Sequence, residues 1–133
     1  MKEKPILFNG EMVKAILDGR KTMTRRVMRG ACPYGAVGDR LWVRETWCPL
    51  NQDYAPAARG VSLPSDGSNV IVSYRADHVD PRGDAMLLQW RPAIFMPRWA
   101  SRITLRIVNV RLELATWDSN PWVWVVSFEV LHE

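Results

Sequence analysis

The stretch RITLRIVNVRLELATWDSNPWVWVVSFEVL, residues 102–131, contains two runs of alternating apolar residues. In the first run Ile103, Leu105 and Ile107 occupy odd positions, and the apolar residues from Val108 to Leu114 occupy even ones. Alternation with a period of two is typical of a β-strand, and one extra residue shifts its phase. We therefore predict a long strand at 103–114 with a β-bulge near residues 107 and 108.

The second run, WVWVVSFEVL at 122–131, is apolar on both faces, which is typical of a central strand. Its first face carries Trp122, Trp124, Val126, Phe128 and Val130. Core packing is the preferred interpretation for its two tryptophans, because large aromatic rings bury much apolar area. We predict that this strand lies in the middle of the sheet.

An amphipathic helix is predicted near the N-terminus. Asn9 is a suitable N-cap, and the apolar stripe that follows has helical spacing: Met12, Val13, Ile16 and Leu17. Gly19 is suited to the position just after the last turn. The following segment, GRKTMTRR at 19–26, is rich in charge and in threonine. We predict that it is a loop or short turn.

The stretch GDRLWVRETW, residues 38–47, returns to strand-like alternation and places Glu45 on the face that carries Leu41, Val43 and Trp47. Residues 48–69 are dense in Pro, Gly, Ala, Ser and Asp, and predict a long, exposed, flexible loop. Residues 70–76 predict another strand. One helix followed by several strands indicates an α+β fold, a small curved sheet or β-barrel with the helix packed at one side.

Length and composition limit the class of protein. A chain of 133 residues with 47% apolar and 24% charged residues predicts one globular domain over 1–133. No apolar run approaches the roughly 20 residues that span a bilayer, so an intracellular protein without membrane association is expected. The two cysteines and two histidines lack the spacing of a zinc site, so we predict no metal and no cofactor.

Positive charge is concentrated in one segment. The formal net charge is +4, and residues 14–29 hold six cations against Asp18 alone. Clustered cations with nearby aromatic rings are typical of nucleic-acid binding, although a solvated basic surface is the alternative. The predicted binding residues are Arg20, Thr22, Arg25, Arg26, Arg44, Trp47, Tyr74, Arg98, Trp99 and Ser101.

A hydrolytic site is a second hypothesis for the same region. A carboxylate at Glu45 on an apolar face requires a cation or hydrogen-bond donors, and Lys21 is a natural partner. A desolvated lysine beside a hydroxyl can abstract a proton, which makes Lys21, Thr24 and Glu45 a candidate catalytic set. The alternative is a buried ion pair that only joins strand and loop.

The segments GRKTMTRR (19–26) and GDRLWVRETW (38–47) together resemble the ASCH domain, a relative of the PUA RNA-binding fold. The chain is also similar to phage and prophage ASCH proteins in the stretches KPILFNGEMVKAILDGRKTMTRR, CPYGAVGDRLWVRETW, YRAD, WRPAIFMPRWASRITL and NPWVWVVSFEV. It departs from those proteins in the short connection ATWDSNP at 115–121.

The resemblance implies a PUA-like barrel that binds RNA or a modified nucleoside or nucleotide in the cytoplasm of a bacterial host. It also implies two enzymatic alternatives, an amidohydrolase acting on N4-acylated cytidine, with Lys21 and Thr24 matching the family motif, and a ribonuclease. A third alternative is a phage accessory protein that binds a host protein through residues 48–69. The sequence leaves the oligomeric state open.

Overall fold

The computed structural model describes residues 1–52, 63–78 and 89–132. The chain divides into two compact units: unit 1 comprises Met1–Ile6, Ala15–Val43 and Arg102–Glu133, and unit 2 comprises Leu7–Lys14 and Arg44–Ser101. The described residues form an α+β protein with one α-helix. In the described part of the chain, no helix is long and apolar enough to cross a bilayer.

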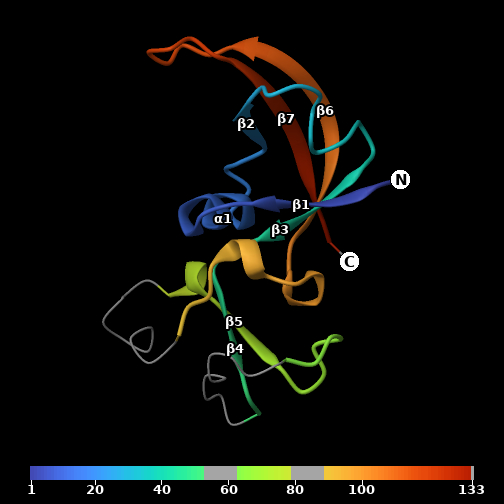
Figure 1. Ribbon diagram of the computed structural model, residues 1–133, viewed down its shortest axis with the longest axis vertical. Helices are drawn as coiled ribbons and strands as arrows, with labels where there is room; N and C mark the ends of the chain where they lie inside the picture. The colour runs from blue at the N-terminus through green and yellow to red at the C-terminus, as the bar shows by residue number, and fades with distance from the viewer. Residues whose placement is uncertain (53–62, 79–88, 133) are drawn as a thin grey trace. The chain divides into compact units, whose positions relative to one another are not determined.

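A five-stranded mixed sheet, which apart from Leu7 and Arg44 at strand ends belongs to unit 1, has the order β1-β3-β6-β7-β2. The strands are β1 (Glu3–Leu7), β2 (Met23–Val27), β3 (Arg40–Arg44), β6 (Thr104–Leu114) and β7 (Trp122–Leu131) (Figure 1). The neighbours β3 and β6, β6 and β7, and β7 and β2 pair antiparallel. Among the described strands, β1 and β2 remain separate edges, so the sheet is open. Of the two predicted forms, a curved sheet or a β-barrel, the closed barrel is therefore wrong.

The two long strands follow the sequence pattern closely. The register between β6 and β7 shifts between Ile107 and Asn109, which confirms the predicted bulge. Strand β7 lies between β6 and β2, which confirms its central position. The expected burial of its tryptophans is wrong for Trp122, which is 52% exposed, and Trp124 is only half-buried. The strand is therefore central in the sheet but not covered along its whole length.

Helix α1 (Gly10–Leu17) confirms the predicted N-terminal helix. The Asn9 side-chain oxygen accepts a hydrogen bond from the backbone N–H of Met12 at 2.8 Å, which satisfies one of the unpaired donors of the first turn. Gly19 has a φ of +77°, a left-handed conformation that costs glycine little and other residues more. Both ends of the helix are thus defined by single residues.

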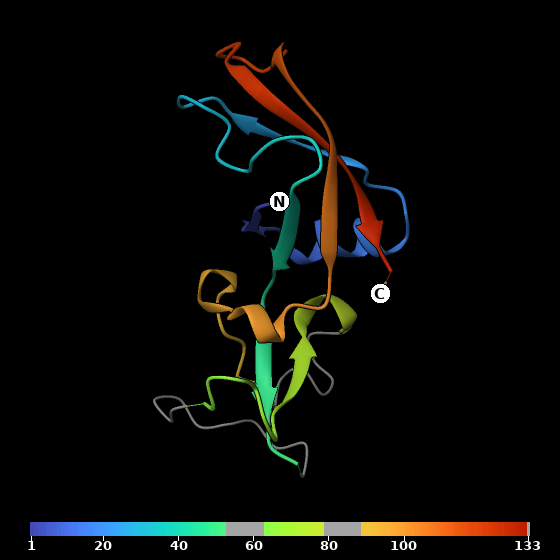
Figure 2. The ribbon, with the colours of Figure 1, turned by 90° about the vertical axis from the view of Figure 1, so that its right-hand side faces the viewer.

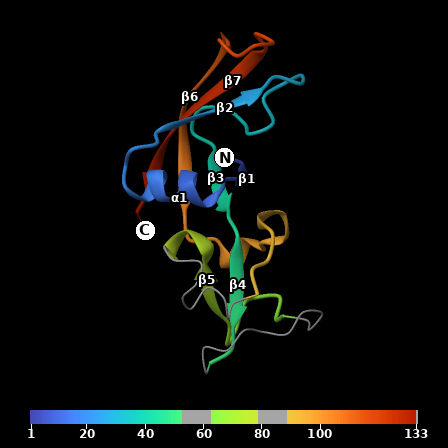
Figure 3. The same ribbon diagram turned by 90° about the vertical axis from the view of Figure 1, so that its left-hand side faces the viewer.

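Strand β2 occupies residues for which the sequence predicted a loop. Residues 23–27 pair with residues 123–127 of β7 over their whole length (Figure 3). Thr24 is buried at 3% exposure, and its neighbour Arg25 is exposed, so the segment has the alternation of a strand. The prediction of a loop was wrong for two reasons. The many charged residues made the short alternation of a strand difficult to recognise in the sequence. The pairing partner, β7, also lies about 100 residues away in the chain.

Unit 2 contains a two-stranded antiparallel sheet of β4 (Trp47–Leu50) and β5 (Ile71–Tyr74), followed by the short 3₁₀-helix η1 (Arg75–Asp77) (Figure 2). Further 3₁₀-helices are η3 (Ala93–Phe95) and η4 (Arg98–Ala100). Trp47, Met96 and Ala100 form a buried cluster in this unit. The predicted loop at 48–69 is corrected at 48–50, which are strand, and its residues 53–62 lie outside the described part.

The contribution of the Asn9 cap to the stability of helix α1 can be measured. Replacing Asn9 by alanine removes the acceptor for the Met12 N–H and should lower the free energy of unfolding by about 1 kcal/mol. Urea denaturation followed by circular dichroism measures the change. Asn9→Ser is the control, since serine is also a good N-cap. Equal stability of the two variants would contradict the cap.

Candidate nucleic-acid interface

The basic segment of unit 1 is held in place at both ends. The backbone N–H groups of Arg20 and Lys21 both donate to the Ala15 carbonyl, at 2.8 and 3.0 Å, which turns the chain away from the helix end. The Thr22 carbonyl then accepts from the N–H of Phe128 at 2.9 Å, where the chain joins β7. Lys21 and Thr22 are therefore positioned by backbone contacts.

The cations of this segment act on one another. The pKa of Lys21 is lowered, first by burial and then by the positive charges of Arg26 and Arg25. Desolvation and like charge both disfavour the protonated ammonium group. An anion bound beside these side chains would relieve the repulsion, so the arrangement favours a negatively charged ligand.

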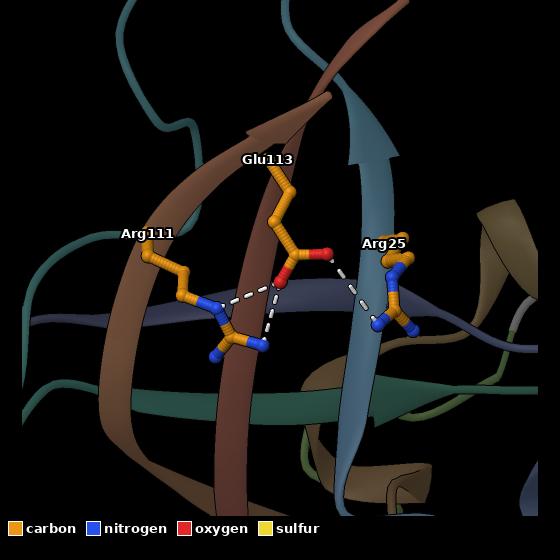
Figure 4. A network of polar contacts seen from close by, with 3 residues as sticks. All are labelled: Arg25, Arg111 and Glu113. Carbon is orange, nitrogen blue, oxygen red and sulfur yellow. Dashed lines mark hydrogen bonds and ion pairs between the residues drawn. The ribbon is translucent and has the colours of Figure 1, made fainter. Parts of the chain in front are cut away.

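Arg25 and Arg26 lie on opposite faces of the sheet, because successive residues of a strand alternate. Arg25 approaches Glu113 at 3.7 Å, and Glu113 is bound on its other side by Arg111 at 2.7 Å. Figure 4 shows the Glu113 carboxylate between the two guanidinium groups. The charge of Arg25, one of the predicted binding residues, is therefore partly balanced by Glu113 within the protein.

Arg26 is oriented by two neighbours on its own face. Its Nε donates to the Thr24 hydroxyl at 3.3 Å, and its Nη1 donates to the Tyr34 hydroxyl at 3.5 Å. The guanidinium carbon also lies 5.8 Å from the centre of the Tyr34 ring, within cation–π range. Arg26, Tyr34 and Arg29 line a hollow of about 470 Å³. This hollow combines two guanidinium groups with an aromatic ring.

A second hollow, of about 340 Å³, contains Lys21 and Thr22. Its remaining lining comes from the end of helix α1, from β7 and from the C-terminal segment: Ile16, Leu17, Gly19, Phe128, Glu129, Val130 and His132. The volume lies at the lower end of the range of small-molecule sites. Lys21 and Thr22 thus share a cavity, whereas Arg20 is exposed and bound to Asp18 at 3.0 Å.

The other predicted binding residues belong to unit 2 and have structural contacts there. Trp47 is 2% exposed, so its ring is packed inside the unit and not displayed to a base. The ring of Trp99 meets it edge to face at 6.0 Å. The Tyr74 hydroxyl donates to the Ala100 carbonyl at 2.7 Å, and the Arg44 Nε donates to the Met96 carbonyl at 3.1 Å. Arg98 and Ser101 lie at and just after η4.

The proposed catalytic residues are divided between the units. Lys21 and Thr24 belong to unit 1, and Glu45 belongs to unit 2, between β3 and β4. Glu45 is 1% exposed, as its position among apolar residues in the sequence suggested. Its role beside Lys21 stays a prediction.

Sequence reasoning did not select Arg29 and Tyr34 as site residues. Arg29 was visible as a member of the basic segment, but Tyr34 lies among turn residues, between Pro33 and Gly35. Only the contact between Tyr34 and Arg26 identifies it. Within the described ranges, no group of three or more His, Cys, Asp or Glu side chains is arranged to hold a metal ion.

Comparisons of the chain with protein-family models, with curated proteins and with solved structures find no match. The chemistry of the site therefore carries the functional argument.

The electrostatic description of Lys21 can be tested by titration. The chain has four lysines, Lys2, Lys4, Lys14 and Lys21, so ¹³C-methylated lysine signals can be assigned one by one. We expect Arg26→Gln to raise the pKa of Lys21 toward its ordinary value, and Arg25→Gln to raise it less, because Arg26 contributes the larger effect. An unchanged Lys21 titration in both variants would contradict the description.

The same shift predicts a pH dependence of stability. Because folding lowers the pKa of Lys21, the unfolded chain binds more protons between the folded value and 10.5. The free energy of unfolding should therefore rise with pH across this window in the native protein, relative to Lys21→Gln. Urea denaturation at several pH values measures the difference, and parallel pH curves for the two proteins would refute it.

Proposed function

We propose that this protein binds RNA or nucleotides through the basic segment of unit 1. The observation that carries the proposal is the crowding of Lys21, Arg26 and Arg25, which lowers the pKa of Lys21 and would be relieved by phosphate. The hollow beside Arg26 adds Arg29 and Tyr34, a combination suited to phosphate and base.

The proposed fold assignment agrees with this function. We propose that residues 1–133 form one ASCH-type, PUA-like domain. The support is the resemblance of residues 19–26 and 38–47 to that family, together with the order of helix and strands. Under this assignment Lys21 and Thr22 would lie at the ligand-binding segment of the domain, and both line a cavity.

Binding is tested by fluorescence anisotropy with a labelled single-stranded RNA over a range of salt concentrations. Lys21→Gln and Arg26→Gln should each weaken binding and lower the slope of log K against log[salt] by about 1. Arg75→Gln is the matched control, because it removes the same charge from unit 2, where Arg75 donates a hydrogen bond to the His78 carbonyl. Equal affinities and slopes for all of these variants and the native protein would exclude the basic segment as the binding site.

A second candidate function is hydrolysis of an N4-acylated cytidine, which the lowered pKa of Lys21 favours. Lys21 would take a proton from water as the water attacks the amide carbonyl. The carbon–nitrogen bond then breaks, and the proton passes to the departing amine, giving a carboxylic acid and cytidine. Thr24 is 3% exposed and its hydroxyl accepts from Arg26, so we assign it a positioning role rather than direct attack.

This candidate is tested with N4-acetylcytidine and chromatographic detection of cytidine. The rate should rise with pH until Lys21 is neutral and should be lost in Lys21→Gln. Lys14→Gln, the same change at a lysine of unit 2, should leave the rate unaltered. Absence of release by the folded native protein would eliminate the hydrolase and leave the binding function standing.

A further inference from the structure

Apolar side chains remain exposed at the far end of the β6 and β7 hairpin. In the antiparallel register Leu114 lies opposite Trp122, and Leu112 lies opposite Trp124, so these four share one face of the sheet. Leu114 is 54% exposed, Trp122 52% and Leu112 44%. The same face is closed nearer the core, where Val126 and Phe128 are buried.

The opposite face of the same hairpin is covered. Val123 and Val125 have no exposed surface there. Arg25 and Arg111 each lie directly opposite Val125, and Glu113 lies opposite Val123. The two valines form a buried cluster with Ala115, and Met23 packs against this cluster. The charged side chains beside the valines form the ion-pair network of Figure 4. At this end of the hairpin, the face that carries Trp122 is therefore exposed, while the face that carries Val123 is buried.

The charge on the exposed face is positive. Arg26 lies opposite Trp124 in the register, and Arg29 lines the same hollow as Arg26. The carboxylates of β6 and β7, Glu113 and Glu129, both belong to the opposite face, where each is paired with arginine. Asp118 lies in the turn that joins the two strands. Aromatic rings, leucines and guanidinium groups therefore occur together on this face.

We propose that this face is a platform for single-stranded nucleic acid, with bases stacked on Trp122 and Trp124 and phosphates bound by Arg26 and Arg29. The inference rests on the proposed RNA-binding function and names the form of RNA and the residues that contact its bases. Stacking on aromatic side chains is tolerant of sequence, and arginines beside the rings supply the attraction for the backbone.

The spacing of the two tryptophans favours a single strand over a duplex. Residues two apart on a strand are separated by about 7 Å along it. Stacked bases of a duplex are only about 3.4 Å apart along each strand. Two rings at the larger spacing match bases that have been separated from each other, as in the recognition of single-stranded RNA on a sheet.

Part of the platform is already ordered without ligand. The indole N–H of Trp124 donates to the Gly30 carbonyl at 3.2 Å, which fixes the orientation of the ring. Arg26 is held by Thr24 and Tyr34. Fixing these groups before binding reduces the entropy lost on association. A second copy of the chain fits this face less well, because it would bring two sets of Arg26 and Arg29 together.

The test uses the full chain and a labelled RNA of about 12 nucleotides, a length within the usual range of single-strand sites. Trp122→Ala should weaken binding by about 5- to 150-fold, the loss expected for one stacked base. Trp122→Phe should recover much of the affinity, because an aromatic ring is restored. The salt slope should stay unchanged in both variants, since neither removes a charge.

A control variant and a control ligand test whether binding depends on Trp122 and on a single strand. Phe95→Ala removes an aromatic ring that is 72% exposed in unit 2, and it should leave binding unchanged. A duplex of the same length should bind more weakly than the single strand. Because Trp122 is half exposed, its alanine variant should keep a melting temperature close to that of the native protein, which thermal denaturation checks.

Different results would contradict the tryptophan platform and the proposed RNA-binding function. If the native protein binds RNA and Trp122→Ala binds it equally well, the platform is wrong and the basic segment stands. If the native protein binds no RNA or nucleotide, both fail. If sedimentation shows a dimer of the native protein that Trp122→Ala dissociates without loss of RNA affinity, a second copy covers this face and the platform is overturned.

Discussion

The register between β6 and β7 determines which side chains share a face in unit 1. Before the bulge, Leu105 and Ile107 lie opposite Val130 and Phe128, and after it Val110 lies opposite Val126. The shift between Ile107 and Asn109 keeps all of these apolar residues on one face although their spacing changes from odd to even positions. Without it, the apolar residues of the outer half of β6 would face away from the core.

The two faces of the β6–β7 hairpin differ in how far their apolar side chains are buried. On one face Val123 and Val125 are buried in a cluster with Ala115, and Arg25 and Arg111 beside them both approach Glu113. On the other face Trp122 is half exposed, Arg26 lies opposite Trp124, and Arg29 lines the same hollow as Arg26. The asymmetry concentrates both apolar area and positive charge on a single surface, which is the combination that a polyanion with aromatic bases requires.

The sequence was sufficient where local chemistry decides the structure. Asn9 and Gly19 delimit helix α1, and the phase change near Val108 identifies the bulge, because each depends on neighbours in the chain. It was insufficient where a distant partner decides. Strand β2 forms because β7 offers an edge for pairing, and the exposure of Trp122 depends on how far the core extends along that strand. Tyr34 joins the site only through its contact with Arg26.

Val108 is the extra residue of the bulge, and it is 42% exposed. The Val108 side chain therefore contributes little to packing. The presence of this residue in the chain, however, determines on which face each later side chain of β6 lies. Substitutions at this position are tolerable, but loss of the residue would exchange the two faces of the outer strand, placing Arg111 and Glu113 beside Trp124. The hairpin should thus accept variation in side-chain identity at Val108 and in the length of its turn at 115–121, and reject single-residue insertions or deletions within β6.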